Sequence, residues 1–299
     1  MALNKGFKAQ LAAFFANFIF GFSFIFSKTA LKYATPSVML AARFIFAFLF
    51  LNIILLFGGA HIKFKGKKIL PVLVMGLMQP VIYFYCESYG MLLSSATFAA
   101  VMIALVPIGA MLFSAIFMKE VPTVLQALSS VVSVLGVIFL SVGKSKIGGS
   151  SYLGIIFLIG AIVSAVGFNA ISRRTSAEFS PFERTYIMFA LSAVVFTFAA
   201  VFENIKSPQI LISPLFKTEF WVAILYLGGL SSVAAFLMIN YANTHLPISQ
   251  TTVFSNIITV VSLFSGIVIL KDTELTLLNL LYSAMIIFGV YGVQRFCRK

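Results

Sequence analysis

Two ionisable side chains inside long apolar stretches are the first candidates for chemistry in this chain. Glu87 is the one acidic residue well inside such a stretch, and Arg43 is the one basic residue deep in another. An ionisable group in hydrocarbon is costly and usually faces an internal cavity. Burial favours the neutral form of a carboxylic acid, so Glu87 could exchange a proton during a transport cycle. Alternatively, Glu87 could pair with Arg43 or reach the outer interface.

Arg43 also has two interpretations. Its planar guanidinium could bind a carboxylate or phosphate of a substrate through two parallel hydrogen bonds. It could equally neutralise Glu87 or bond the carbonyl groups at a helix end. We favour the structural role, because an arginine inside a helical bundle is usually paired.

Uncharged polar residues extend the candidate substrate or proton site. Gln79 and Tyr83 precede Glu87 at helical spacing, which favours one polar face on that helix. The other candidates are amides and a hydroxyl within apolar stretches: Asn17, Asn169, Asn240, Ser255 and Asn256. Small polar stripes can line a permeation cavity, but they can also be faces where two helices pack closely.

The composition indicates which solvent surrounds the protein. Of the 299 residues, 61% are hydrophobic and 10% are charged, whereas a soluble chain is about a quarter charged. Lipid tolerates such a surface. The net charge of +13 comes from Lys and Arg between the apolar stretches, where the positive-inside rule predicts them. Nucleic-acid binding would need a clustered basic face, so we expect membrane lipids and no nucleic acid as partners.

Apolar stretches of sufficient length predict an all-α membrane protein with ten transmembrane helices. A helix needs about 20 apolar residues to cross the hydrocarbon core. The stretch 69–118 is long enough for two helices, and we divide it at Ser94-Ser95. The other predicted spans are 9–27, 36–60, 121–143, 147–172, 185–202, 220–244, 246–270 and 275–294.

The distribution of Lys and Arg predicts the orientation of these helices. If the N-terminus is cytoplasmic, the cytoplasmic segments carry about twice as many Lys and Arg residues as the outer segments. We therefore predict a multi-pass protein of the cell membrane with both termini in the cytoplasm.

The two halves of the chain resemble each other and predict an internal repeat, with units 1–147 and 148–299. Shifts of 145 and then 152 residues pair Ser27 with Ser172, Lys28 with Arg173, Pro36 with Pro181, Gly76 with Gly228, Tyr89 with Tyr241, and Lys119-Glu120 with Lys271-Asp272. Each unit would hold five helices. Because five is odd, the second unit must enter the membrane in the opposite orientation, and inverted repeats permit alternating access.

The two five-helix units resemble the drug/metabolite transporter superfamily, EamA type. The segment 87–96 is similar to the end of the family's third helix, where an acidic or polar residue, an aromatic and a small-residue turn lead into the fourth helix. Pro107 also fits, whereas Thr259 and Asp272 depart from the pattern. The resemblance implies a transporter whose central cavity is built from helices one to four and six to nine, with the fifth and tenth outside.

Motifs for catalysis, cofactors or metals are not predicted. Gly143-Lys144-Ser145 is similar to the end of a phosphate-binding loop, but the glycine required upstream would fall at Ile138. His61 and His245 lie far from any acidic or cysteine cluster, so we expect no metal site.

These observations favour a secondary transporter that exports amino acids or similar small metabolites by alternating access, with Glu87 coupling export to protons. The alternative is an uncoupled facilitator or an uptake carrier in which Glu87 is structural. A membrane-embedded enzyme would need a cluster of catalytic groups at one interface, which the sequence lacks. A channel would leave the inverted repeat unexplained.

Overall fold

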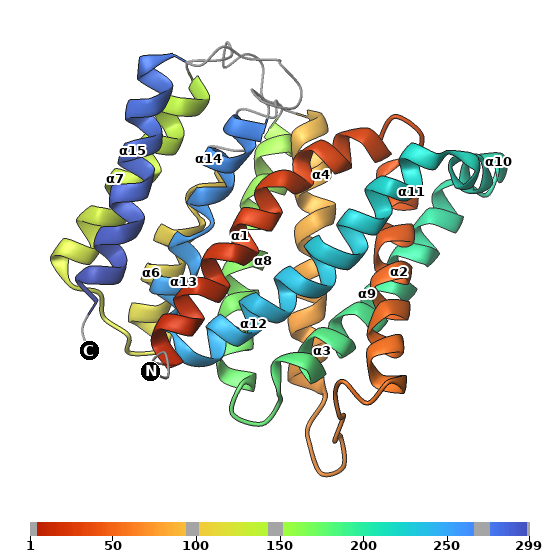
Figure 1. Cartoon of the computed structure of the whole chain (residues 1–299), viewed down its shortest axis with the longest axis horizontal. Coiled ribbons are helices and arrows are strands. Elements are labelled where there is room, and N and C mark those ends of the chain that lie inside the picture. The colour runs from red at the N-terminus through yellow and green to blue at the C-terminus, as the bar shows by residue number, and fades with distance from the viewer. Residues whose placement is uncertain (1–4, 94–101, 143–151, 266–275, 298–299) are drawn as a thin grey trace.

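The computed structural model describes residues 5–93, 102–142, 152–265 and 276–297, and every regular element in those ranges is a helix (Figure 1). The elements of the first half are α1 (Lys5–Ala30), α2 (Pro36–Leu56), α3 (Leu70–Gly76), the π-helix η1 (Leu77–Ile82), α4 (Tyr83–Leu93), α6 (Val106–Phe117) and α7 (Val124–Val142). The elements of the second half are α8 (Tyr152–Thr175), α9 (Pro181–Glu203), α10 (Gln209–Ile212), η2 (Ser213–Phe216), α11 (Thr218–Ile224), the π-helix η3 (Leu225–Ala234), α12 (Ala235–His245), α13 (Ile248–Val253), α14 (Asn256–Ser265) and α15 (Leu277–Arg295).

Helix starts follow signals in the sequence. Pro36 and Pro181 each begin a helix at a position where the missing N–H is not needed. Ser180 and Glu183 form a capping box, in which each side chain binds the other residue's backbone N–H. The divisions predicted at Ser94-Ser95 and near 143–147, and the pairing with Lys271-Asp272, lie outside the described residues.

Apolar helices of membrane-spanning length dominate the fold, so the prediction of a multi-pass all-α membrane protein is confirmed. Within the described residues, seven helical segments are long and apolar enough to cross a membrane: Lys5–Ala30, Pro36–Leu56, Leu70–Gly90, Tyr152–Thr175, Pro181–Glu203, Thr218–His245 and Leu277–Arg295. Two shorter apolar helices span Val106–Phe117 and Val124–Leu140. The count of ten and the cytoplasmic termini remain predictions.

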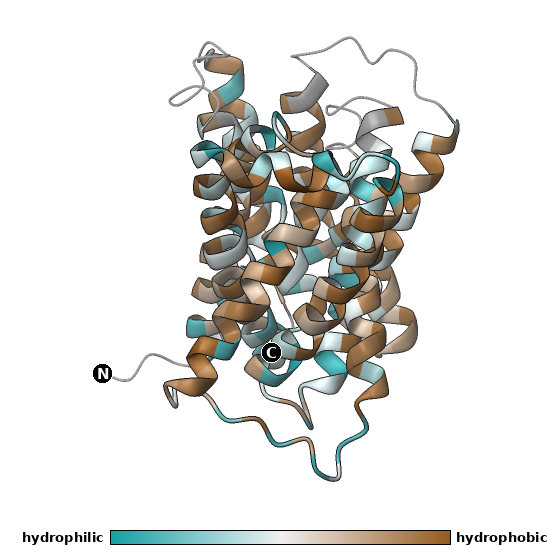
Figure 2. Cartoon of the chain, turned by 90° about the vertical axis from the view of Figure 1, so that its right-hand side faces the viewer, coloured by the Kyte–Doolittle hydropathy of each residue, from teal (hydrophilic) through white to brown (hydrophobic). Residues whose placement is uncertain are grey.

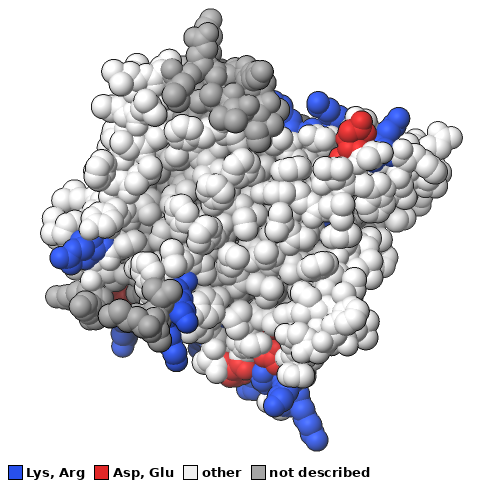
Figure 3. All heavy atoms as spheres, viewed as in Figure 1, with Lys and Arg blue, Asp and Glu red and all other residues white. Residues whose placement is uncertain are grey.

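The distribution of polar residues matches a membrane setting. In Figure 2 the helices are mainly hydrophobic along their length, and hydrophilic residues are frequent in the connections. On the face seen in Figure 3, charged side chains gather near the lower edges and the upper right, and the broad surface between them is almost entirely uncharged.

The helices of the two halves pack in reciprocal pairs. Helix α1 packs against α12 and α14, and α8 correspondingly packs against α4 and α6. Helices α2 and α9 pack against each other, as do α7 and α15. The α1–α2 connection lies at the top of Figure 1 and the α8–α9 connection at the bottom, so corresponding parts of the two halves lie at opposite ends of the molecule.

A pair of glycines shows that the reciprocity extends to single contacts. A Cβ on Gly228 would lie 3.1 Å from the backbone oxygen of Arg43 in α2, and a Cβ on Gly76 would lie 3.1 Å from the Cα of Met188 in α9. Arg43 and Met188 are themselves 145 positions apart, the shift that aligns the first helices of the halves. Each half therefore places its third helix directly on the second helix of the other half.

The third and fourth helices are interrupted in each half. The third helix of each contains a π-helical segment, η1 or η3, and Gln79 within η1 has an extended backbone with φ −144° and ψ 125°. The fourth helix of each is broken by a turn, before Val106 in one and at Phe254-Ser255 in the other. Irregular backbone within a membrane is tolerated where it is buried in protein or lines a cavity.

Candidate functional site

A cavity of about 200 Å³ lies between the two halves and is bordered by the interrupted helices. Its walls come from α1, α2, η1, α4, α6, α8, η3, α12, α13 and α14. Its polar lining residues are Asn17, Ser23, Ser27, Arg43, Gln79, Tyr83, Glu87, Ser88, Asn169, Ser231, Thr251, Thr252 and Ser255. Helices α7 and α15 contribute no lining residue. Helix α9 contributes none either, although the resemblance implied that the seventh helix would take part.

Glu87 stands at the cavity wall with a neighbouring hydroxyl. Both Glu87 and Tyr83 lie on α4, one helical turn apart, and both line the cavity. The Tyr83 hydroxyl donates a hydrogen bond to Oε1 of Glu87 over 3.1 Å. Gln79 lines the same cavity from η1. The polar face expected from the spacing of these three residues therefore points into the cavity.

Arg43 reaches the cavity from α2, and its guanidinium is bound by hydroxyl groups. Its Nε donates to Oγ of Ser232 over 2.8 Å, and its Nη2 donates to Oγ of Ser231 over 3.1 Å. The guanidinium carbon also lies 4.7 Å from the centre of the Phe84 ring, a cation–π distance.

The sequence left open whether Arg43 pairs with Glu87, and no ion pair joins these two described residues. The ion pairs among the described residues join Lys67 to Glu183 and Arg173 to Glu120. Serines of η3 take the place of the carboxylate, because the close contact of Gly228 with α2 brings that segment against Arg43. One cavity therefore holds a guanidinium and a carboxyl group with no direct ion pair between them.

Two of the predicted amides line the cavity, one from each half. The side-chain Nδ2 of Asn17 donates to the backbone oxygen of Ala13, and that of Asn169 donates to the backbone oxygen of Ala165. Each amide oxygen is thereby turned away from its own helix backbone. Ser255 also lines the cavity, and its buried hydroxyl has no hydrogen-bond partner in the described part of the chain.

Two other predicted site residues lie away from the cavity. Asn240 is fully buried, and its Nδ2 donates to Thr185 of α9 over 2.9 Å. Asn256 donates to Ser133 of α7 over 3.0 Å. Both amides occupy helix faces that pack on neighbouring helices, a distinction that helical spacing alone does not make.

Sequence reasoning missed the second buried arginine. Arg184 lies in the first turns of α9 and is 0% exposed. Its Nη2 donates to the Asn240 backbone oxygen over 2.7 Å and to Thr244 Oγ1 over 2.6 Å, while Nη1 donates to Ser172 Oγ over 2.9 Å. The capping motif from Ser180 to Glu183 was the available signal, because it places residue 184 inside the first turn of α9.

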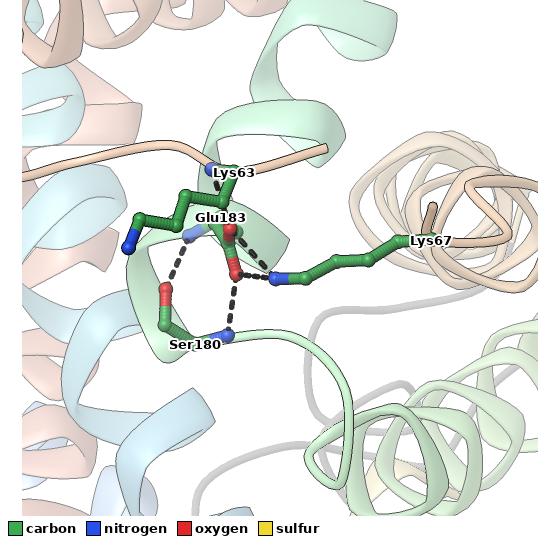
Figure 4. Close-up of polar contacts among 4 residues, drawn as sticks. All are labelled: Lys63, Lys67, Ser180 and Glu183. Carbon is green, nitrogen blue, oxygen red and sulfur yellow. Dashed lines mark hydrogen bonds and ion pairs between the residues drawn. The ribbon is translucent and has the colours of Figure 1, made fainter. Parts of the chain in front are cut away.

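The neighbouring residue, Glu183, fastens a loop of the first half to α9 (Figure 4). Its carboxylate accepts hydrogen bonds from Lys67 Nζ over 2.7 and 2.8 Å and from the Lys63 backbone N–H over 2.9 Å. The Ser180 backbone N–H donates to the same carboxylate over 2.8 Å. Charge-assisted bonds of this kind are roughly twice as strong as neutral ones, so the loop is held firmly on the start of α9.

Comparisons with known proteins match a transporter family and its relatives by sequence, and a solved structure by fold. The model of the EamA-like transporter family matches residues 7–142 and again residues 152–295. The uncharacterized transporter YcxC of Bacillus subtilis (strain 168) is 32% identical over 287 residues, which cover 95% of this chain and 92% of that protein. An uncharacterized transporter of Archaeoglobus fulgidus is 24% identical over 276 residues, covering 92% and 94%. A solved crystal structure with 17% identity has a TM-score of 0.79 and covers 97% of both chains, which shows likeness of fold.

Proposed function

Because this chain belongs to the EamA-like transporter family, whose members are transporters and not enzymes, we propose that it is a secondary active exporter of amino acids or similar small metabolites. The two matched segments act as inverted five-helix repeats, with units 1–147 and 148–299, and alternate the access of one central site between the two sides of the cell membrane.

The proposed substrate class rests on two ionisable groups in the cavity that are not paired with each other. Arg43 and Glu87 both line it and form no ion pair with each other. A zwitterion satisfies both groups, with its carboxylate on the Arg43 guanidinium and its ammonium group on Glu87. The volume of about 200 Å³ suits a small solute, and Phe20, Phe168 and Phe236 supply an apolar wall.

Glu87 links substrate movement to protons in this proposal. A protonated Glu87 has lost the charge that holds an ammonium group, so proton and substrate compete for one site. Tyr83, Gln79, Asn17, Asn169 and Ser255 complete its polar lining. Competition of this kind yields exchange of one external proton for one internal substrate molecule, provided that the empty, unprotonated carrier does not reorient.

Flux measurements in proteoliposomes test the proposal. A pH gradient should drive accumulation of labelled amino acids by the parental protein, and Glu87→Gln should abolish that dependence while the protein still elutes as a folded species. Glu219→Gln is the matched control, because Glu219 is exposed at the start of α11. If the Glu87→Gln protein keeps its proton-driven flux, Glu87 does not couple transport to protons. Flux in the parental protein that follows the substrate gradient and ignores pH would identify an uncoupled facilitator.

A further inference from the structure

Corresponding parts of the two halves form the two ends of the cavity. One end lines the cavity, and the other is buried. Near the α1–α2 connection, the cavity is lined by Ser27, Met39, Leu40 and Ser88. The repeat shifts of 145 and 152 residues convert these four positions into Ser172, Arg184, Thr185 and Asn240. In the second half, all four are 0% exposed, and none lines the cavity.

Hydrogen bonds join the four positions of the second half to one another and to α12. Arg184 of α9 joins Ser172 of α8 to Asn240 and Thr244 of α12. Ser172 Oγ also donates to Oδ1 of Asn240 over 2.8 Å. Because Met39 stands where the other half has Arg184, the first half cannot form the same bonds.

Hydrogen-bonded polar groups lead from the cavity wall to the buried cluster around Arg184. The side-chain oxygen of Asn169, a lining residue, accepts a hydrogen bond from Nδ2 of Asn243 over 3.0 Å. Asn243 also contacts Ser172 Oγ over 3.2 Å. Further out, Arg173 donates to the Thr244 backbone oxygen over 2.6 Å. A continuous set of hydrogen-bonded polar groups therefore lies between the cavity and the α8–α9 connection.

The charge of Arg184 in this cluster is balanced without a carboxylate from the described ranges. None of the ion pairs among the described residues includes Arg184, so its charge is balanced by hydroxyl and carbonyl oxygens, including those near the C-terminus of α12, where the helix dipole is negative. Arg184 Nε and Asn243 Oδ1 are buried without hydrogen-bond partners in the part of the chain that the structure describes. Water entering an opened end would satisfy both atoms, which offsets the loss of the bonds that keep it closed.

We propose that Arg184 is a positioning residue that latches the α8–α9 end of the cavity shut, and that the latch releases when the cavity turns to that side. The inference rests on the alternating access proposed above. In the present conformation, the cavity is then reached from the α1–α2 end. Release of the latch separates the C-terminal part of α12 from α8 and α9, as the α1–α2 end closes over Met39 and Ser88.

Sided thiol labelling tests the latch without relying on transport. Cys86 and Cys297 are first replaced by Ala and Ser, and Ala165→Cys is introduced as a reporter, because Ala165 lines the cavity from α8. A membrane-impermeant maleimide is applied in the cold to one face or the other of oriented vesicles. We expect rapid labelling from the face of the α1–α2 connection and slow labelling from the face of the α8–α9 connection.

Arg184→Gln removes the charge-assisted bonds, so labelling from the α8–α9 face should rise about tenfold or more. Arg184→Lys keeps one cation and should give a smaller rise. Arg174→Gln is the matched control, since Arg174 is exposed one residue beyond Arg173. Thr244→Val, which removes one acceptor, replaces Arg184→Gln if that variant does not fold.

Unchanged labelling from the α8–α9 face in folded Arg184→Gln and Thr244→Val proteins would overturn the latch, as would equal labelling of the parental reporter from both faces. A merely structural role would lower thermal stability without changing the ratio of the two labelling rates. The result is separable from the proposed function, because a coupled exporter can lack this latch, and the latch can open in a carrier whose flux ignores pH.

Discussion

At the scale of single residues, each of the two ionisable groups in the cavity is held by uncharged partners. Arg43 is held by two serine hydroxyls and an aromatic ring, and Glu87 by the Tyr83 hydroxyl. Neutral partners orient a charged group without cancelling its charge, so both groups can still bind an ion. This arrangement distinguishes the cavity from the Lys67–Glu183 contact, where direct pairing serves to hold a loop.

Arg43→Gln tests the role of the guanidinium in substrate binding. We expect KM for labelled amino acids to rise about tenfold or more, because a hydrogen-bonded charged contact is worth about 1.5–3 kcal/mol. Transport of the corresponding amines, which lack the carboxylate, should keep its KM. Competition by amino acids and amines in proteoliposomes measures both, and an equal loss for both classes would mean that Arg43 is structural.

At the scale of elements, the outer helix pair α7–α15 is a packing unit that stands apart from the site. Neither helix lines the cavity, and the two pack closely through glycines. A Cβ on Gly136 would lie 3.0 Å from the Tyr282 backbone oxygen, and one on Gly289 would lie 2.6 Å from the Ser129 backbone oxygen. Small residues allow such close approach in membranes, where packing replaces the hydrophobic driving force.

Gly289→Ala should therefore lower stability without altering the site. The added methyl meets backbone atoms of Ser129 and Ser133, which cannot rotate away, and overpacking of this kind costs about 1–3 kcal/mol. Thermal unfolding in detergent should occur at lower temperature, while KM of the folded fraction stays unchanged. Gly6→Ala is the control, because nothing lies within 4 Å of its added Cβ. Equal unfolding temperatures for both variants would contradict the close packing.

At the scale of the whole molecule, orientation in the membrane decides which end of the cavity faces the cytoplasm. The excess of Lys and Arg predicts cytoplasmic termini. The α8–α9 connection would then be cytoplasmic, because it lies at the same end of Figure 1 as the two labelled termini. The latched end would face the cell interior, and the present conformation would be open to the outside.

Protease accessibility of epitope tags tests this orientation. A tag after the C-terminus should be cleaved in inside-out vesicles and protected in intact spheroplasts. A tag inserted between Lys206 and Ser207, in the connection between α9 and α10, should show the opposite pattern, because one further span separates it from the α8–α9 connection. Cleavage of the C-terminal tag in intact spheroplasts would reverse the orientation and place the latch on the outer side.

Much of the fold could be predicted from the sequence, because the membrane imposes simple requirements. Apolar length predicted helices, and the repeat shifts aligned Gly76 with Gly228, positions that make reciprocal contacts in the structure. Most of the residues predicted for the site lie on the cavity, and their roles in transport stay a prediction. Glu87, Tyr83, Gln79, Asn17, Asn169 and Ser255 do line the cavity, since polar groups in apolar helices must face the protein interior.

The sequence by itself determined that the chain is embedded in lipid, that it folds as helices and that its two halves are similar. Apolar length and spacing are local properties of the sequence, so they can be read without the tertiary structure. The tertiary structure decided which polar residues meet. Only packing could direct Asn240 and Asn256 onto neighbouring helices rather than into the cavity, bring Ser231 and Ser232 to Arg43, and bury Arg184 among oxygen atoms. These contacts join positions far apart in the chain, so the local pattern carries no record of them. They also make the two ends of the cavity different in a protein built from similar halves.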